Sequence, residues 1–514
     1  MAPNRVIGDR CLAPGVQDDG CPAGTLGLED GTCEPAGIPP QLCAAGFEAD
    51  GQRGCEPILP AEPCPLGSIA VPGDSQCRPV APCGTGAWGD IPIEPNTIYV
   101  DARYQGVDSD GRAAAPFTTI GEALAAAPDG ALIAVAAGSY VEDVSINHRV
   151  RLWGVCPDRV TIAGTGAQVA ALGVYFGSGT EIHSIGVRGM LAGIDVTGSE
   201  NVVLDRVWVH DVGWRGINTD TNFGPTSLTV SGSLIEGGRE MGISVMGAMT
   251  ATVEQSVVRD TAPRLGGATA GISIQLRCTE RACEPEQRPS VTVRGSLLER
   301  NENLGLIVGG SEARIEGSVI RTTRSNAGHE NGVGIATTLA CHPSGVCYPE
   351  APIRVAVVSS IVEQNQEYGL FAYGGETTIE GSVFRETLPL ANGEFGFGIN
   401  IEACEPEFPC PTRPRVSLRS SLIDRNQHIG MSAAGADATI DGTLFRDTLP
   451  RAFDNVSGNG LILTCYETGS GCPPAARTVA TVRGSLLERN HDVSLSVAGS
   501  EALLEGVVVR DTLP

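Results

Sequence analysis

The chain has 514 residues, a formal net charge of −25 and 67 glycines, and aromatic residues make up only 4% of it. This charge disfavours binding to nucleic acid, because both partners would be polyanions. All 35 basic residues are arginine, which excludes chemistry that needs a lysine. The composition is typical of a core of small and β-branched side chains joined by many tight turns.

The first 95 residues are rich in cysteine and poor in large apolar side chains. Three related phrases, CPAGTLGLEDGTCEP, CAAGFEADGQRGCEP and CPLGSIAVPGDSQCRP, each place two cysteines around a Gly/Asp turn. Because so little core is available, we predict a disulfide-stapled segment over 1–95, similar to small extracellular cysteine-rich modules. Eight cysteines allow 105 pairings, and the sequence does not choose among them. Cys156, which lies outside this segment, is left as the odd cysteine. We interpret the segment either as a spacer or cap or as a binding module.

The same cysteines indicate an oxidising compartment, so we expect an extracellular or outer-surface protein. The first residues, MAPNRVIGDRC, contain no apolar signal core, and no apolar run is long enough to span a membrane. An export signal is therefore expected outside this sequence.

Residues 97–146 open a second region, predicted to run from 96 to 514. Asp101, Asp108 and Asp110 in DARYQGVDSDG predict either calcium ligands or an Asx-rich turn. Thr119 followed by IGEALAAA predicts a short capped helix that ends before Pro128, where it would cover the first sheet edge. The Y-V-D strand, the P-x-x-T-I-x-x-A helix and the G-x-Y-x-E turn of this stretch resemble the opening of the pectate-lyase-like superfamily. The resemblance implies an all-β fold, a right-handed parallel β-helix solenoid with a short N-terminal capping helix.

That superfamily includes polysaccharide lyases, hydrolases, epimerases, esterases and non-catalytic surface proteins. Of the polygalacturonase-like motifs the chain has only N-T-D, at 218–220, which we interpret as turn chemistry. Of the epimerase motif D-P-H-D it has only the tail. The surrounding phrase WVHDVGWRGINTD contains an acid/base pair and an arginine suited to an acidic sugar. We expect a structural corner here, with Asp211 in the polar ladder described below; the catalytic alternative uses His210, Asp211, Arg215 and Asp220.

From about residue 232 the sequence repeats with a period of about 63 residues. The phrases GSLLERN, SSIVEQN, SSLIDRN and GSLLERN begin at 295, 359, 420 and 484, and a second series follows each by about 22 residues. Period-two alternation within each phrase indicates strands, so each unit is predicted to be a short coil followed by a long one. The matching positions form a predicted polar ladder with a structural role: Asn301, Asn365, Asn426 and Asn490 in short coils, and Thr323, Thr387, Thr448 and Thr512 in long coils.

Four long coils each contain a small loop with two cysteines. Local disulfides are predicted for Cys278–Cys283, Cys341–Cys347, Cys404–Cys410 and Cys465–Cys472. These loops recur every second coil, so neighbouring loops are expected to lie roughly 9.6 Å apart. A row with this spacing would suit an extended glycan, and the ligand-binding candidates in or beside the loops are Tyr348, Phe408 and Tyr466. The alternative is that these disulfides only make the solenoid more resistant to proteases.

The sequence therefore predicts a mainly structural or binding β-helix protein of a surface or matrix, with polysaccharide as its expected partner. The alternative class is a polysaccharide-modifying enzyme. No cofactor other than calcium is expected. The last signature, GVVVRDTLP, is followed by no capping element, which predicts self-association through an open C-terminal coil.

Overall fold

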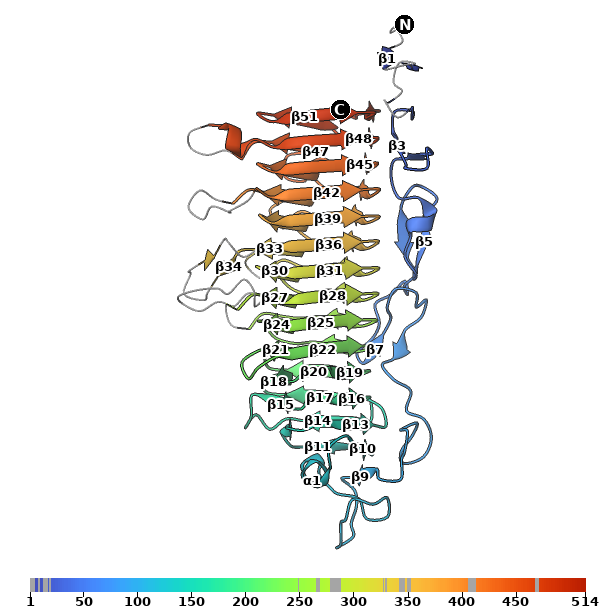
Figure 1. The fold of residues 1–514 in the computed structure, drawn as a ribbon, viewed down its shortest axis with the longest axis vertical. Helices are drawn as coiled ribbons and strands as arrows, with labels where there is room; N and C mark the ends of the chain where they lie inside the picture. Colours follow the sequence, from blue (N-terminus) through green and yellow to red (C-terminus); the bar gives the residue numbers. More distant parts are fainter. Residues whose placement is uncertain are drawn as a thin grey trace. The chain divides into compact units, whose positions relative to one another are not determined.

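The computed structural model describes residues 5–7, 10–12, 17, 20–247, 249–264, 269–277, 288–326, 328, 331–341, 347–348, 353–404, 413–466 and 471–514. The chain divides into two compact units. Unit 2 contains Leu59–Glu302 and Ser311–Ala313, and unit 1 contains Met1–Ile58, Asn303–Gly310 and Arg314–Pro514. Each contains right-handed parallel β-helix, the fold predicted from the sequence (Figure 1). Within the described ranges, no helix is both long and apolar enough to cross a membrane.

In unit 2 each coil contributes one strand to each of three parallel sheets. The first sheet contains β9 Ile98–Val100, β10 Ala131–Val135, β13 Val150–Gly154, β16 Glu181–His183, β19 Val202–Asp205, β22 Thr226–Ser231, β25 Met249–Glu254 and β28 Ser290–Arg294. The second contains β11 Gly138–Tyr140, β14 Val160–Ala163, β17 Gly186–Gly189, β20 Trp208–Val212, β23 Leu234–Glu236, β26 Val257–Arg259 and β29 Leu297–Glu299. The third contains β12 Val144–Ile146, β15 Ala170–Tyr175, β18 Ala192–Thr197, β21 Ile217–Asp220, β24 Met241–Met246 and β27 Ala270–Gln275.

Unit 1 has the same three faces. Its first sheet contains β36 Arg354–Val358, β39 Glu376–Glu380, β42 Arg415–Arg419, β45 Asp437–Asp441, β48 Val479–Arg483 and β51 Glu501–Glu505. Its second contains β32 Val319–Arg321, β37 Ile361–Glu363, β40 Val383–Arg385, β43 Leu422–Asp424, β46 Leu444–Arg446, β49 Leu486–Glu488 and β52 Val508–Arg510. Its third contains β30 Leu304–Gly309, β33 Val333–Thr338, β38 Tyr368–Tyr373, β41 Phe397–Glu402, β44 Ile429–Ala434, β47 Asn459–Thr464 and β50 Leu495–Ala498. Strand β31 (Glu312–Glu316) has residues in both units.

The strand register confirms the predicted alternation of short and long coils. Val357 pairs with Ile379 on the next coil, and Ile379 pairs with Leu418 on the one after. All three are fully buried, because alternate residues of a strand face opposite sides and one side is the core. The polar ladder is confirmed as well: the Oδ1 atom of Asn365 accepts from the backbone N–H of Thr323 at 3.0 Å, while its Nδ2 donates to a backbone carbonyl.

The predicted capping helix is confirmed as α1, Ile120–Ala126, with Thr119 as its N-cap. Thr119 and Glu122 form a reciprocal capping box, which satisfies amide donors at the first turn. The buried face of α1 presents Ile120, Ala123 and Leu124, and the helix packs on β9, β10 and β12. It therefore covers part of the first coil of unit 2.

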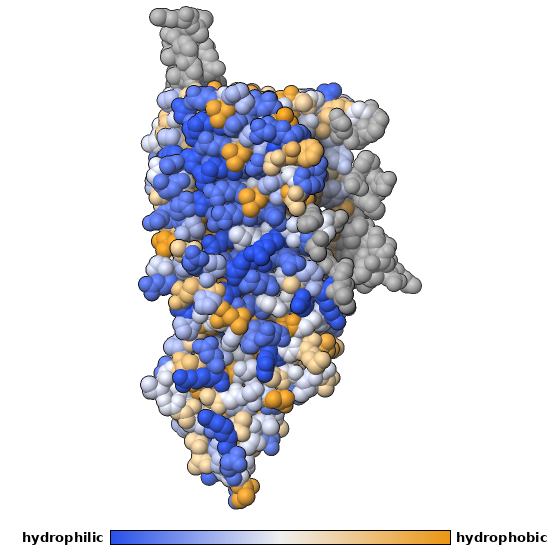
Figure 2. Space-filling model, turned by 180° about the vertical axis from the view of Figure 1, so that it is seen from behind, coloured by the Kyte–Doolittle hydropathy of each residue, from blue (hydrophilic) through white to orange (hydrophobic). Residues whose placement is uncertain are grey.

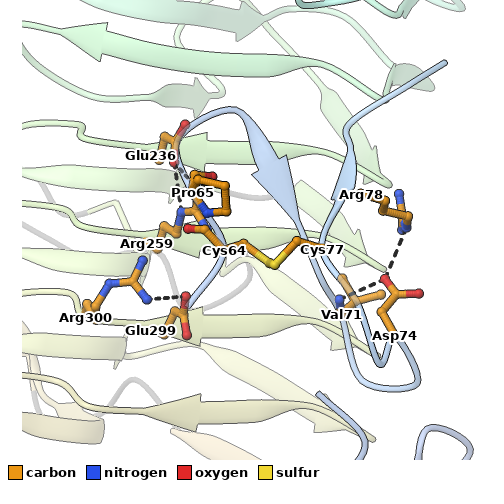
Figure 3. Close-up of a disulfide and its surroundings, with 10 residues drawn as sticks. All are labelled: Cys64, Pro65, Val71, Asp74, Cys77, Arg78, Glu236, Arg259, Glu299 and Arg300. Carbon is orange, nitrogen blue, oxygen red and sulfur yellow. Dashed lines mark hydrogen bonds and ion pairs between the residues drawn. A yellow bond between two sulfur atoms is a disulfide. The ribbon is translucent and has the colours of Figure 1, made fainter. Parts of the chain in front are cut away.

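The cysteine-rich residues of unit 2 lie against the outer side of the second sheet (Figure 3). Arg259, 2% exposed, forms an ion pair with Glu236 at 2.5 Å and donates to the carbonyl oxygens of Cys64 and Pro65 at 3.1 and 2.9 Å. The backbone N–H of Gly67 donates to Glu236 at 2.9 Å. Strands β7 (Ser68–Ile69) and β8 (Arg78–Pro79) form the hairpin that follows.

The cysteine-rich residues of unit 1 use the same kind of contact. Arg385 forms ion pairs with both Glu363, on the neighbouring strand, and Glu56. Glu56 belongs to the hairpin of β5 (Phe47–Ala49) and β6 (Cys55–Pro57). Arg446 donates to the carbonyl of Gln52 at 2.8 Å. A second hairpin joins β3 (Thr25–Gly27) and β4 (Cys33–Pro35), and near the chain start β1 (Arg5–Ile7) pairs with β2 (Arg10–Leu12).

Disulfides in the cysteine-rich segment join neighbours in sequence: Cys21–Cys33, Cys43–Cys55 and Cys64–Cys77. The interpretation of Cys156 as an odd cysteine was wrong, because it is bonded to Cys83. Cys156 is fully buried just after the end of β13, and its partner lies 73 positions earlier in the sequence. Only the folded coil brings the two cysteines together.

Candidate functional site

A row of polar residues runs along the outer face of the third sheet in unit 2. The register aligns Gly173, Asp195, Asn218 and Ser244 on four successive strands, β15, β18, β21 and β24. Their sequence neighbours, such as Leu172 and Ile194, point into the core, so these four positions face outward. The N-T-D motif at 218–220 therefore lies in a strand, and its interpretation as turn chemistry was wrong.

Hydrogen bonds connect this row across the coils. The hydroxyl of Tyr175 bonds to Asp195, whose Oδ1 also accepts from Nδ2 of Asn218 at 2.7 Å. The Oδ1 atom of Asn218 in turn accepts from Arg215 at 2.7 Å, and Arg215 reaches the hydroxyl of Ser244 at 3.3 Å. The amide of Asn218 is thus oriented by a donor on one side and an acceptor on the other.

The guanidinium of Arg215 is held by the corner of the next coil. It donates to Oε1 of Glu240 at 2.9 and 3.2 Å and lies 4.4 Å from the ring centroid of Trp214. The indole N–H of Trp214 donates to the other oxygen of Glu240 at 2.8 Å. Glu240 therefore neutralises the arginine and fixes the indole ring.

One carboxyl group in this row and one beside it have different environments. Asp195 is only 7% exposed, and burial raises the pKa of its carboxyl, with the negative charge of Asp220 acting in the same direction. Asp220 is half-buried and accepts from the backbone N–H and the side-chain amide of Asn222 at 2.8 and 2.5 Å. Burial also raises the pKa of Tyr175, so its hydroxyl keeps its proton.

Exposed aromatic rings border the row. Phe176 and Phe223 are 63% and 57% exposed, and their ring centroids lie 5.7 Å apart. Tyr175 meets Phe223 edge-on at 6.1 Å. Large apolar rings kept in water beside a hydrogen-bonded polar row are a feature of binding surfaces.

The structure divides the sequence candidates of the phrase WVHDVGWRGINTD into separate sets of contacts. Arg215 contacts Asn218, and Asp220 lies at the end of the same strand. His210 instead lies on β20, stacked on Trp208 at 3.9 Å, with its Nδ1 bonded to Asp211 at 2.8 Å.

Trp208 is also covered by the cysteine-rich segment. A Cβ added to Gly67 would lie 3.1 Å from the Trp208 ring, and the indole donates to Glu236. Asp211 adopts a left-handed backbone conformation, φ 48°. Arg300, which directly precedes the ladder residue Asn301, adopts the same conformation, as does Asp260 on the neighbouring coil. The placement of Asp211 in the ladder itself was therefore wrong by one residue.

Of the calcium candidates, Asp101 and Asp110 each accept the backbone N–H two residues on, as Asx turns do. The backbone carbonyl of Asp108 accepts from the hydroxyl of Tyr104. Within the described ranges no group of three or more histidine, cysteine or acidic side chains has a metal-binding arrangement. Calcium binding stays a prediction.

The stapled loops are only partly within the described residues. Cys465 is bonded to Cys472, and the hairpin of β34 (Ala340–Cys341) and β35 (Cys347–Tyr348) pairs Cys341 with Cys347 through the backbone. Cys404 is disulfide-bonded. Cys278, Cys283, Phe408 and Cys410 lie outside the described residues. Tyr466 is half-buried, and its backbone N–H donates to Ala476.

No family model and no curated relative matches this chain. Among solved structures it is similar to the pectate lyase Pel9A, at 13% identity over 74% of this chain and 81% of that one, with a TM-score of 0.39. It is also similar to the catalytic domain of an alpha-1,3-glucanase in complex with nigerose, at 11% identity over 84% and 70%, TM-score 0.42. A third is the A-module of a mannuronan C-5 epimerase from Azotobacter vinelandii, at 11% identity over 74% and 91%, TM-score 0.37. Likenesses this distant concern the fold alone.

Proposed function

We propose that this protein binds a neutral polysaccharide across the outer face of the third sheet of unit 2. The observation that supports this proposal is the hydrogen-bonded row from Tyr175 through Asp195 and Asn218 to Arg215. It offers donors and acceptors side by side, which is what sugar hydroxyls require, since each both donates and accepts. The rings of Trp214 and Phe223 at its borders offer apolar faces for the C–H surfaces of a sugar.

Charge favours a neutral ligand over an acidic one. Arg215 is compensated by Glu240, and Asp220 adds a further negative charge beside the row. The chain as a whole has a net charge of −25. Figure 2 shows one face on which hydrophilic residues predominate and apolar residues are scattered, as expected for a surface that remains in water. A polyuronate would be repelled by this field unless salt screened it.

The disulfides favour a protein that works outside the cytosol. Among the described residues, four bridges hold the cysteine-rich segment, one closes a loop of unit 1, and Cys404 is disulfide-bonded as well. Such bridges persist in oxidising compartments. We therefore propose that the protein is located at a cell surface or in a matrix. We also propose that the disulfide-containing loops provide additional contacts to the glycan.

Retention on immobilised polysaccharides tests the proposal. The wild-type protein should be retained on a subset of neutral polymers, and Asn218→Ala should reduce retention at least tenfold, because it removes the central donor and acceptor together. Thr229→Ala, on the outer face of the first sheet at β22, is the matched control and should bind as the wild type does. Retention on acidic polymers only, or equal retention of both variants, would contradict the proposal.

Cleavage of the glycan is the second candidate, and the difference between Asp195 and Asp220 favours it. Glycoside hydrolysis needs one protonated and one ionised carboxyl group near the scissile bond. Asp195, with its raised pKa, would be the acid, and Asp220 would be the base or nucleophile. New reducing ends that disappear in both Asp195→Asn and Asp220→Asn would identify hydrolysis. Retention without new ends would identify a binding protein.

A further inference from the structure

A groove in unit 1 follows the turns that connect the second sheet to the third. Its volume is about 530 Å³. From Gln364 to Leu449 it is lined by the turns that precede β38, β41, β44 and β47, and the structure describes every residue of these four turns. The groove shares no residue with the row at Asp195, so an inference about its ligand does not depend on the proposed function.

Along one wall of the groove, leucine and glutamine alternate from coil to coil. Leu388 and Leu449 are 45% and 40% exposed, and each is paired through its backbone with the glutamine of the preceding coil, Gln366 or Gln427. Both leucines stand in the phrase Thr-Leu-Pro, which returns at the corresponding place with Leu513, 39% exposed. The repeat therefore keeps a large apolar side chain partly in water on alternate coils. Such a regular row differs from the scattered apolar exposure of an ordinary surface.

The glutamines beside these leucines have unused hydrogen-bonding atoms. Oε1 of Gln366 accepts from the backbone N–H of Ser325 at 2.5 Å, and Nε2 of Gln427 donates to the backbone carbonyl of Pro450. Among the described residues, neither Nε2 of Gln366 nor Oε1 of Gln427 has a hydrogen-bond partner. The groove therefore offers a ligand one amide donor and one amide acceptor in the same row as the leucines.

The charged side chains of the opposite wall are paired within the chain. Glu386 accepts from the side-chain amide of Gln364 at 2.9 Å and forms an ion pair with Arg425 at 2.8 Å. Arg425 also pairs with Asp424 at 2.6 Å. Arg324, one coil beyond Gln366, is exposed to solvent, which screens its charge. Because the net charge of −25 repels an acidic ligand and a basic one would have to displace Arg425, charge favours an uncharged ligand.

We propose that this groove binds an uncharged proline-rich peptide in the polyproline II conformation. That conformation has three residues per turn and rises about 3.1 Å per residue, so equivalent side chains recur about every 9.3 Å. Leu388 and Leu449 are two coils apart, which is roughly 9.6 Å at about 4.8 Å per coil. One edge of the peptide would therefore meet one leucine per turn. The side chains on one face of a β-strand recur about every 6.8 Å and would not match this spacing.

The hydrogen-bonding atoms of the groove fit the same ligand. The backbone carbonyl groups of a polyproline II helix have no partners within the peptide, so Nε2 of Gln366 can donate to one of them. A residue other than proline once per turn would supply an N–H for Oε1 of Gln427. The peptide is already extended before it binds, which lowers the entropy cost. Sugars pack best on aromatic rings, and none is among the described residues that line the groove.

Titration calorimetry with three uncharged probes tests the proposal. The probes are a twelve-residue peptide of repeated Pro-Pro-Gln with blocked ends, a scrambled peptide of the same composition without the three-residue period, and cellohexaose. The wild-type protein should bind the periodic peptide at least fivefold more tightly than the scrambled one. Leu388→Asn, Leu449→Asn and Gln427→Ala should each weaken binding of the periodic peptide at least fivefold. Leu503→Asn, at an exposed leucine of β51, is the matched control and should bind as the wild type does.

Three results would overturn the proposal: equal affinity of the wild type for the two peptides, wild-type affinity in both leucine variants, or displacement of the periodic peptide by cellohexaose. The last result would identify the groove as a glycan site. Cellohexaose that binds without displacing the peptide occupies a different site, so failure of this proposal is distinguishable from failure of the proposed function. The comparison of the two peptides needs only the wild-type protein, and it decides the question even where a substitution lowers stability.

Discussion

Replacing Asn426 by alanine should destabilise unit 1 by about 3–5 kcal/mol. The side chain of Asn426 is fully buried, accepts from the backbone N–H and the hydroxyl of Thr387 at 3.1 and 2.8 Å, and donates to the carbonyl of Phe384 at 3.0 Å. Three hydrogen bonds at about 1 kcal/mol each give about 3 kcal/mol, and the two backbone groups left buried without a partner raise the cost toward about 5 kcal/mol.

Hydrogen exchange and urea denaturation measure this effect at two scales. The amide of Thr387 should exchange faster in Asn426→Ala, because its acceptor is gone, and the urea midpoint should fall. Ser417→Ala, at an exposed position of β42, should change the free energy of unfolding by less than about 0.5 kcal/mol. A loss below about 1 kcal/mol for Asn426→Ala, with unchanged exchange at Thr387, would refute the structural role of the ladder.

Two further predictions concern the core and the pH response. Val357→Asp should place an unpaired charge between stacked strands and cost several kcal/mol, whereas Ser359→Asp, at a half-buried corner, should cost far less; similar urea midpoints for the two would contradict the assigned alternation. Burial lowers the pKa of His428 in the folded state to about 4, below its ordinary 6.5, so folding favours the neutral ring. The free energy of unfolding should therefore decrease as the pH falls from 6.5 to about 4, because the unfolded chain takes up the proton more readily. The loss should be about 1–2 kcal/mol after allowance for solvent screening, and His428→Gln should remove it from pH-dependent thermal melts.

The repeat body was predictable because its signal recurs. Each phrase such as GSLLERN places the same residue types at the same coil position, so one correct assignment of strand and corner applied to all of them. The ladder of Asn365 and its counterparts followed for the same reason. The capping helix was predictable from a local signal, the reciprocal pair of Thr119 and Glu122.

The candidate site was predicted only in part, because it depends on the pairing of coils before the repeats become regular. Asp195, Tyr175 and Glu240 belong to three different coils, and no shared phrase aligns them in the sequence. Arg215 and Asp220 could be predicted as candidates only from their residue types. A register derived by stepping back from residue 232 in intervals of about 22–26 residues would have placed Asp195 beside Asn218.

The contacts of the cysteine-rich segment were not predictable for a different reason. Its residues meet strands that are hundreds of positions away, as Glu56 meets Arg385. Each arginine at that strand position looks like an ordinary surface residue in the sequence. Its burial becomes evident only when the segment is seen to lie on the sheet.

The bond between Cys83 and Cys156 has a mechanical consequence for unit 2. It closes a covalent loop with a sequence separation of 73 residues, and that loop contains α1 and the strands β9 to β13. Tension applied along the chain would pass through the sulfur–sulfur bond and bypass the loop. The capped first coils would therefore bear no load while the later coils were peeled away, so this end of the unit is the part that a pulling force would unravel last.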